Sequence, residues 1–311
     1  MRRGGPGEAW LLLALTTLFW AGNAVIARAL QGAFPPVTLS FLRWVIALAL
    51  VLPFAAGALW RARETLRRHW RPLVALGVFG AAGYTTLLYV AVQTTTATSA
   101  VLINATTPVL ILVLGRIVFG TPLRGLQLAG VATSFAGALV LVARGDLQVL
   151  TGLSFNPGDL WLVAAALSWA AYTLLLRYRP PGLDALSFLT ATLAVAVAVL
   201  APLSAWEVAQ GGPLQFGMPV VAGLAYFAVF PSVLAYLFWN RGVEEVGANV
   251  AGLFVHLMPV FGIVLAWLFL GEGLAPFHVA GIALILTGIW LTSRYGRRRP
   301  DIDEAAAVGT D

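Results

Sequence analysis

The chain of 311 residues contains no cysteine and no lysine, and only 10% of its residues are charged. Without cysteine there is no disulfide, no thiolate nucleophile and no cysteine-based zinc site. Without lysine there is no Walker-type phosphate loop, whose lysine binds the β- and γ-phosphates of a nucleotide. The three histidines are scattered along the chain. We therefore expect no catalytic residue, no metal site and no cofactor, and do not expect an enzyme.

Hydrophobic residues make up 60% of the chain, whereas soluble domains are about 45–50% apolar and about 25% charged. A soluble fold could not cover its surface with so few charges. A helix needs about 20 apolar residues to cross a bilayer. The sequence therefore predicts an all-α membrane protein with ten transmembrane helices. The apolar runs that give this number are 9–29, 38–58, 73–92, 98–118, 124–143, 159–177, 184–203, 217–238, 248–270 and 276–293.

The arginines predict which side of the membrane each connection faces. All 19 basic residues are arginine, and cytoplasmic connections of membrane proteins carry an excess of Lys and Arg. With the N-terminus inside, only Arg28 and Arg144 fall on the outer side, and Arg43 lies within a run. We therefore expect both termini in the cytoplasm, as an N-terminal segment 1–8 and a disordered tail 294–311.

The chain also repeats itself. A shift of 151 residues places 97–140 on 248–291 without a gap, and Pro108 then coincides with Pro259. Each half holds five runs, and an odd number of crossings inverts the second half relative to the first. Inverted repeats place a substrate site near the midplane and give alternating access. The expected segments are a first repeat 9–143, an outer linker 144–158 and a second repeat 159–293.

Three stretches resemble EamA-type members of the drug/metabolite transporter superfamily. They read PPVTLSFLRW from Pro35, GDLWLVAAALSWAAYTLLLRY from Gly158, and GANVAGLFVHLMPVFGIVLAWLFLGEGLAPFHVAGIALILTGIWL from Gly247. The resemblance covers nearly the whole chain, although Gly120-Thr121 replaces the Gly-Glu that members often have in the first half. It implies ten helices, no ATP hydrolysis, a multi-pass protein of the bacterial inner membrane, and export or facilitated movement of small metabolites.

Aromatic and amide side chains near the middle of the runs are candidates for substrate binding. Trp20 and Asn23 lie three residues apart, and Trp169 and Tyr172 occupy the same places in the second half at a shift of 149. Residues three apart share a helix face, so each pair can line one wall of a cavity. Further candidates are Tyr84, Asn104 and Tyr236.

Two ionisable side chains inside runs need an explanation, because a charge in a bilayer costs several kcal/mol unless it is paired or faces water. Arg43 has three possible roles: an ion pair with Glu272 or Asp159 that locks the outer face, contact with a substrate carboxylate, or contact with a lipid headgroup. His256 lies near mid-depth and is a packing residue, a substrate contact or a proton-coupling group. No Asp or Glu lies at mid-depth, which favours a facilitator or a weakly coupled carrier.

Prolines and glycines suggest where the helices bend and where they approach closely. Pro108 and Pro259 free backbone carbonyls within their runs, so we expect kinks there and treat hinges as a hypothesis. Small residues allow close approach of neighbouring helices. The candidates for such contacts are Gly77, Gly80, Gly83, Gly130 and Gly137.

These observations predict an exporter or facilitator of metabolites that works by alternating access, with neutral or aromatic amino acids as substrates. The alternative substrates are nucleobases, nucleosides or drug-like compounds. The expected partners are a small-molecule substrate and the lipid bilayer, without nucleic acid, and the expected state is a monomer or a weak homodimer. An intramembrane enzyme is disfavoured because the sequence offers neither a metal site nor an acid–base pair. The other alternative, a lipid-handling scaffold, predicts that there is no central polar cavity.

Overall fold

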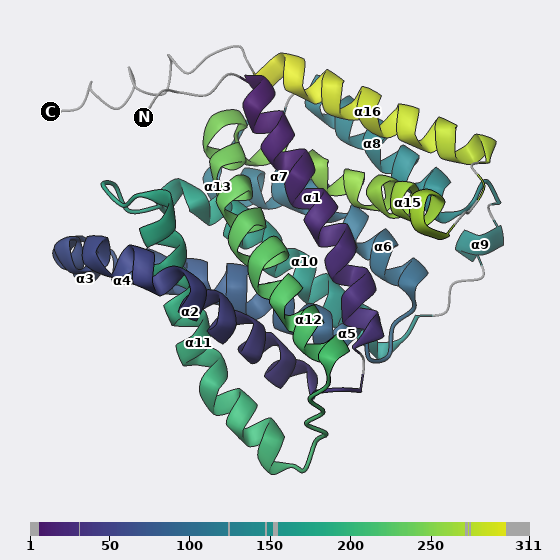
Figure 1. Cartoon of the computed structure of the whole chain (residues 1–311). Coiled ribbons are helices and arrows are strands. Elements are labelled where there is room, and N and C mark those ends of the chain that lie inside the picture. The colour runs from purple at the N-terminus through teal and green to yellow at the C-terminus, as the bar shows by residue number, and fades with distance from the viewer. Residues whose placement is uncertain are drawn as a thin grey trace, which may run out of the picture.

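The computed structural model describes residues 6–30, 32–123, 125–146, 148–151, 155–270, 273 and 275–296 (Figure 1). Every regular element within these ranges is a helix. The helices are α1 (Pro6–Ala29), α2 (Pro36–Arg61), α3 (Arg63–Arg68), α4 (Trp70–Leu76), η1 (Gly77–Gly83), α5 (Tyr84–Ala91), α6 (Ala97–Ala105), α7 (Thr107–Phe119), α8 (Gly125–Val142), α9 (Gln148–Thr151), α10 (Pro157–Leu175), η2 (Leu176–Tyr178), α11 (Ala185–Ala209), α12 (Met218–Phe227), η3 (Ala228–Leu234), α13 (Ala235–Val246), α14 (Ala248–Leu253), η4 (Phe254–His256), α15 (Leu257–Leu270) and α16 (Pro276–Gly296).

Among the described residues, nine helical stretches are long and apolar enough to cross a membrane, with mean hydropathies between 1.5 and 2.2. They coincide with the second to tenth apolar runs, so the prediction of an all-helical membrane protein is confirmed. The first run coincides with α1, a helix of 24 residues, and its crossing stays a prediction. The arginine-rich connection between the second and third runs is helical as well, because 61–71 holds neither Gly nor Pro to break the helix.

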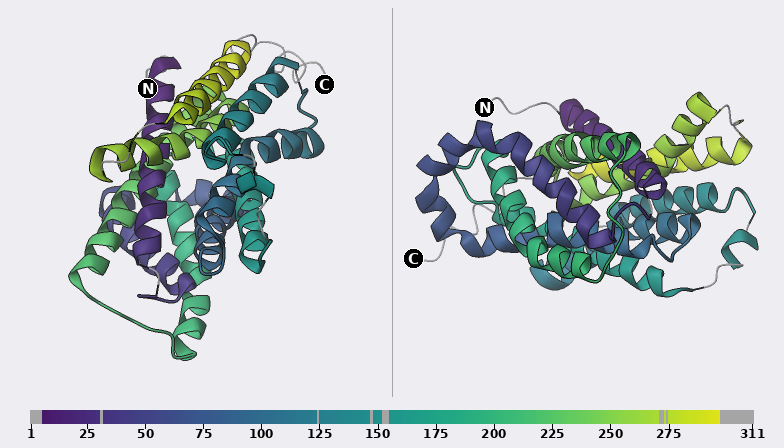
Figure 2. Two further views of the ribbon diagram at one scale, coloured as in Figure 1. Left: turned by 90° about the vertical axis from the view of Figure 1, so that its right-hand side faces the viewer. Right: turned by 60° about the horizontal axis from the view of Figure 1, so that its bottom comes forward.

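Helices from the two halves of the chain pack in antiparallel pairs. The pair α8 and α16 lies side by side in Figures 1 and 2. A Cβ atom added to Gly130 would lie 2.8 Å from the Gly288 carbonyl oxygen, and one added to Gly137 would lie 2.7 Å from the Gly281 carbonyl oxygen. Because the contacts follow opposite orders along the two helices, the helices are antiparallel. Their backbones lie so close together that no side chain fits between them at these glycines.

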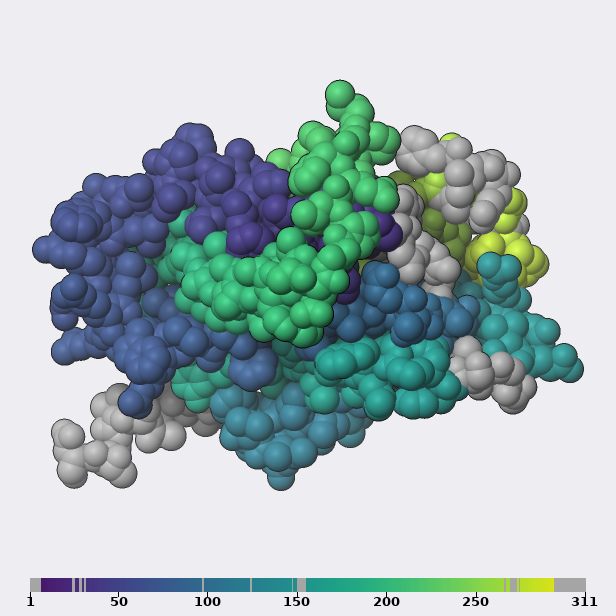
Figure 3. All heavy atoms as spheres, turned by 90° about the horizontal axis from the view of Figure 1, so that it is seen from below, coloured from purple at the N-terminus to yellow at the C-terminus, as the bar shows by residue number. Residues whose placement is uncertain are grey.

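The pair α2 and α11 is also antiparallel, and one carboxylate joins its ends. Glu207, near the end of α11, accepts hydrogen bonds from the backbone N–H of Val37 (3.2 Å) and of Thr38 (2.7 Å) at the start of α2. The N-cap of α2 is a proline without a capping side chain, so Glu207 supplies the missing acceptor. The connection from α11 to α12, green in Figure 3, crosses the purple first helices, and Gln215 N–H bonds the Ala33 carbonyl oxygen at 2.9 Å.

Four long helices surround the centre and form two tightly packed units. Two of the four are α1 and α10, and the other two are the interrupted helices α4–η1–α5 and α12–η3–α13. In one unit α1 packs against α12, η3 and α13, and we name it the α1–α13 unit. In the other, α10 packs against α4, η1 and α5, and we name it the α5–α10 unit. Each unit therefore combines helices from both halves of the chain.

Two π-helical segments, η1 and η3, interrupt the long helices of these units, and they lie 151 residues apart. π-Bulges break the regular hydrogen-bond ladder of a helix, frequently at functional sites. The Gly80 carbonyl in η1 accepts a hydrogen bond from the Tyr236 hydroxyl at 2.7 Å. The Pro231 carbonyl in η3 accepts one from the Trp20 indole N–H at 3.3 Å. Each interrupted helix is thus held by an aromatic side chain from the opposite half of the chain.

The glycine crossing between α8 and α16 gives a direct test of this packing. Gly137→Ala should lower the free energy of unfolding by about 1–3 kcal/mol, since its Cβ meets backbone that cannot move aside. Thermal unfolding in detergent measures the effect. In the control Gly57→Ala the new Cβ meets only the Arg61 guanidinium at 3.6 Å, so stability should rise by about 0.5–1 kcal/mol. Equal effects of the two substitutions would contradict the close crossing.

Candidate functional site

A cavity of about 240 Å³ lies between the two units, and we call it the central cavity. It has an aromatic and amide lining from both units, closed by α6 and by the segment from η4 to α15. Among the described residues, no Asp or Glu lines it, and Arg43 is its charged group. The described residues contain no cluster of three or more His, Asp or Glu side chains suited to a metal ion. Of the predicted site residues, the lining includes Trp20, Asn23, Arg43, Tyr84, Asn104, Tyr236, His256 and Pro259.

The other two predicted binding residues, Trp169 and Tyr172, lie behind this lining. The Trp169 ring meets the Trp20 ring edge to face, with 4.8 Å between centroids. The two tryptophans are 5% and 2% exposed, so neither indole points into lipid. They therefore contact each other rather than line opposite walls. We call the stack to which they belong the aromatic layer, consisting of Trp20, Trp169, Tyr172, Tyr236 and Trp239.

Arg43 is 2% exposed and is held by four neutral groups. Its Nε donates to Ser232 Oγ at 2.6 Å, and its Nη2 donates to the Pro231 carbonyl at 3.0 Å. Its Nη1 donates to Asn23 Oδ1 at 2.9 Å and to Tyr89 Oη at 3.0 Å. The guanidinium thereby joins α2 to α1, α5 and η3. These partners satisfy its donors without neutralising its charge.

The structure narrows the roles expected for Arg43. It does not pair with Asp159, whose carboxylate accepts hydrogen bonds from Thr95 Oγ1 at 2.5 Å and from Asn156 N–H at 3.0 Å at the start of α10. The other expected partner, Glu272, lies outside the described residues. The burial of Arg43 excludes a lipid headgroup as its ligand in this conformation. Contact with a substrate carboxylate remains open, since Arg43 lines the central cavity.

His256 bridges the two halves of the chain. Its Nε2 lies 2.8 Å from the Ala105 carbonyl oxygen, and its Nδ1 lies 2.6 Å from Ser134 Oγ. A carbonyl oxygen only accepts, so Nε2 carries the hydrogen, and Nδ1 accepts from the serine in the neutral tautomer. Both ring nitrogens are therefore occupied, which favours the packing role over a proton-coupling role. Asn104 beside it donates weakly to Met258 Sδ at 3.4 Å.

Both prolines follow breaks in their helices. A turn at Thr106 separates α6 from α7, which contains Pro108, and the 3₁₀ segment η4 precedes the part of α15 that contains Pro259. The Ala105 carbonyl at the first break is the acceptor that His256 binds. The expected irregularities are present, and a hinge role stays a prediction.

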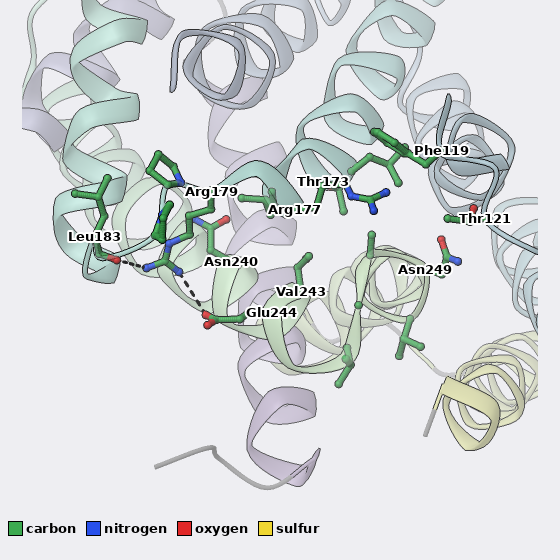
Figure 4. Close-up of a pocket in the computed structure, with 18 of the residues that line it drawn as sticks. Phe119, Thr121, Thr173, Arg177, Arg179, Leu183, Asn240, Val243, Glu244 and Asn249 are labelled. Atoms are coloured by element: carbon green, nitrogen blue, oxygen red, sulfur yellow. Dashed lines mark hydrogen bonds and ion pairs between the residues drawn. The ribbon is translucent and has the colours of Figure 1, made fainter. Parts of the chain in front are cut away.

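A larger cavity of about 730 Å³ opens between the ends of α10 and α13, and we call it the vestibule (Figure 4). On one side Arg179 donates to Glu244 Oε2 at 3.3 Å and to the Leu183 carbonyl at 2.8 Å. The Arg177 guanidinium lies 4.5 Å from the centre of the Phe119 ring. The aromatic layer contacts both cavities, because Tyr172 bonds Asn240 of the vestibule while Trp20 and Tyr236 line the central cavity. A third cavity adjoins the central cavity at the opposite end, and the two share Val101, Pro259 and Gly262.

Sequence reasoning missed several residues that shape this region. Tyr89 and Ser232 bind Arg43, and Asn240 accepts a hydrogen bond from the Tyr172 hydroxyl at 2.6 Å. One signal could have identified Tyr89 and Asn240, because they lie 151 residues apart, at the same shift that relates the two prolines. A search of the two halves for identical residues overlooks this pair, because one position holds a tyrosine and the other an asparagine.

The model of the EamA-like transporter family matches residues 8–143 and 156–294. The chain belongs to this family. It is a multi-pass membrane protein with a small-molecule substrate and a lipid environment, and its bacterial relatives point to the plasma membrane.

Individual proteins are similar over almost their full lengths. An uncharacterized transporter, YyaM of Bacillus subtilis (strain 168), is 27% identical over 91% of this chain and 93% of its own. A probable terminal-alkyne amino-acid exporter of Streptantibioticus cattleyicolor is 28% identical over 92% of this chain and 94% of its own. A crystal structure with 24% identity covers 94% of this chain and 98% of its own with a TM-score of 0.74, which shows the same fold.

The network around Arg43 can be tested by a substitution that keeps the charge. In Arg43→Lys an ammonium replaces the planar guanidinium and cannot reach its four partners, so we expect a loss of about 2 kcal/mol or more in unfolding free energy. Thermal unfolding in detergent measures this loss. The control Arg63→Lys changes an exposed arginine that donates to the Trp60 carbonyl at 3.2 Å, and it should shift stability by less than about 0.5 kcal/mol. Similar shifts for both variants would refute the structural importance of the network.

Proposed function

We propose that the protein is a carrier that exports neutral or aromatic amino acids across the plasma membrane by alternating access between two inverted halves. The observation that carries the proposal is the central cavity. It is buried between two helix units, both halves contribute to its walls, and its lining combines aromatic faces, amides and one guanidinium. Ligand sites typically combine such apolar walls with a few polar groups.

Several observations support the inverted halves. One family model matches both segments of the chain. The π-helical segments lie 151 residues apart, and so do Ala105 and His256, which contact each other. The paired helices α8 and α16 are antiparallel, as expected when an axis perpendicular to them relates the halves. On this basis α1 also crosses the membrane, which brings the number of crossings to ten, and the halves are 9–143 and 159–293.

The arginines support an orientation of the cavities relative to the membrane. With their excess on the cytoplasmic side, both termini lie in the cytoplasm, and so does the vestibule with Arg177 and Arg179. The third cavity, which contains Arg144, then faces outward. The vestibule is the side from which a cytoplasmic metabolite enters. One chain forms the whole path, so a monomer suffices.

The charge and size of the central cavity support amino acids over the alternatives. About 240 Å³ lies below the range of about 300–1,000 Å³ typical of drug-sized ligands. Arg43 attracts a carboxylate, and the absence of Asp or Glu from the lining disfavours organic cations. The side chain of the substrate would pack on Trp20, Tyr84 and Tyr236. The name of the Streptantibioticus relative, an amino-acid exporter at 28% identity, agrees with this choice.

Counterflow in proteoliposomes tests the proposal. Vesicles loaded with unlabelled L-phenylalanine should accumulate labelled L-phenylalanine, and L-leucine, uridine, adenine and phenethylamine are added as competitors. We expect both amino acids to compete and phenethylamine, a cation without a carboxylate, to fail. Trp20→Ala should slow exchange by about tenfold, because it removes one aromatic wall. Trp60→Ala, which changes a 72% exposed side chain, should leave the rate unchanged. Competition by uridine or adenine alone would favour the alternative substrates, and no exchange of any compound would reject the carrier.

The coupling of transport is a separate prediction. Because no carboxylate of the described residues lines the central cavity, carboxylate-based proton coupling lacks its carrier there, and we expect a facilitator or a weakly coupled carrier. Net efflux from loaded vesicles should continue when a protonophore abolishes the proton gradient. Efflux that stops with the gradient would contradict this prediction.

A further inference from the structure

Two hydrogen bonds between a tyrosine and an asparagine connect the α1–α13 unit to the α5–α10 unit. Tyr89 Oη donates to Asn23 Oδ1 at 3.3 Å, and Tyr172 Oη donates to Asn240 Oδ1 at 2.6 Å. The α1–α13 unit supplies both asparagines, and the α5–α10 unit supplies both tyrosines. The central cavity lies between the same two units.

The two bonds lie at opposite ends of the units. The helices α1 and α13 are antiparallel, since a Cβ added to Gly22 would meet Tyr226 whereas one added to Gly242 would meet Leu13. Asn23 therefore lies at the end of the unit far from Asn240, which lines the vestibule. One bond joins the units at the vestibule end, and the other joins them at the opposite end.

The bonds also occupy equivalent positions in the two halves. Tyr89 and Asn240 are 151 residues apart, and Asn23 and Tyr172 are 149 apart. The two residue types are exchanged between the halves: the tyrosine of each pair corresponds in position to the asparagine of the other pair. A two-fold relation repeats every contact on the opposite side of its axis. The repeat thus provides the same kind of closure at each end of the path.

We propose that the Tyr172–Asn240 pair is the inner gate of the transport path and the Tyr89–Asn23 pair its outer gate. This inference rests on the proposed carrier function, because a carrier opens one end of its path at a time. When one pair separates, the two units part at that end and expose the central cavity, while the other pair holds the opposite end closed. Both pairs are formed in the present conformation.

The two gates differ in strength. Arg43 binds both members of the outer pair and ties them to Ser232 and Pro231. Its counterpart at a shift of 147 is Thr190, whose hydroxyl bonds the Leu186 carbonyl of its own helix. At the inner end, the buried polar atoms without a partner among the described residues include Trp169 Nε1, Trp239 Nε1 and Thr173 Oγ1. The inner pair therefore lacks the charge-assisted hydrogen bonds that Arg43 donates to both members of the outer pair.

Cysteine labelling tests the gates without any substrate. The chain has no cysteine, so Ala166→Cys places a single thiol in the lining of the central cavity. The rate of its modification by a membrane-impermeant methanethiosulfonate is measured from each side, in inside-out and right-side-out vesicles. Tyr172→Phe removes one neutral hydrogen bond, and it should raise the rate from the vestibule side by about fivefold. The rate from the outer side should stay the same or fall. Asn240→Ala should act in the same direction.

Two further variants separate a gate from general loosening. Tyr226→Phe removes a hydroxyl that bonds the Phe19 carbonyl within the α1–α13 unit, at 3.0 Å, and it should change neither rate. Tyr89→Phe should raise only the outer rate, because it removes the hydroxyl that bonds both Asn23 and Arg43. Size-exclusion chromatography and thermal unfolding show whether each variant is folded. The proposal is overturned if folded Tyr172→Phe leaves the vestibule-side rate unchanged, raises both rates equally, or acts no more strongly than Tyr226→Phe.

The labelling result is independent of the identity of the substrate. If counterflow fails for every amino acid but Tyr172→Phe opens the vestibule side alone, the proposed substrate is wrong and the gates stand. If amino acids exchange but labelling is unaffected, the carrier stands and the gates are wrong.

Discussion

A bilayer offers no water to a backbone carbonyl, so every interruption of a membrane helix has to find its hydrogen-bond partner inside the protein. The two π-helical segments show how this chain meets that constraint. The Gly80 carbonyl is bound by Tyr236, and the Pro231 carbonyl is bound by Trp20 and Arg43. The side chains around the central cavity are therefore also those that hold the interrupted helices. Fold and site depend on the same contacts.

This dependence explains why polar and aromatic groups gather at the interrupted helices. A tyrosine or an arginine inside a membrane protein needs an acceptor, and an interrupted helix provides one. The same arrangement leaves the two helix units joined by few direct bonds. Packing within each unit is close, whereas the units meet across a cavity, an aromatic layer, the Tyr236–Gly80 hydrogen bond and two tyrosine–asparagine pairs. The structure thus contains two closely packed units with a cavity between them, and our proposal of alternating access rests on this arrangement.

Sequence reasoning identified most of the helices, and it failed where the direction in which a side chain points from its helix matters. Hydropathy locates a span because its length is set by the bilayer. It does not locate the inward face, since lipid and protein interior are equally apolar. Trp20 and Trp169 were correctly placed near mid-helix, but only Trp20 lines the cavity. The neutral partners of Arg43 could not be predicted either, because the pattern of residues does not reveal that η3 leaves the Pro231 carbonyl available.

The central claim is that the two units move apart at one end while they close at the other. Pulsed electron resonance distances between spin labels test it directly. One label pair, at Gln93 and Met218, spans the outer end of the units, and a second, at Tyr178 and Val246, spans the vestibule end. Addition of a transported amino acid should shift the two distance distributions in opposite directions, one lengthening as the other shortens. Distributions that both stay fixed, or that both lengthen, would contradict the account.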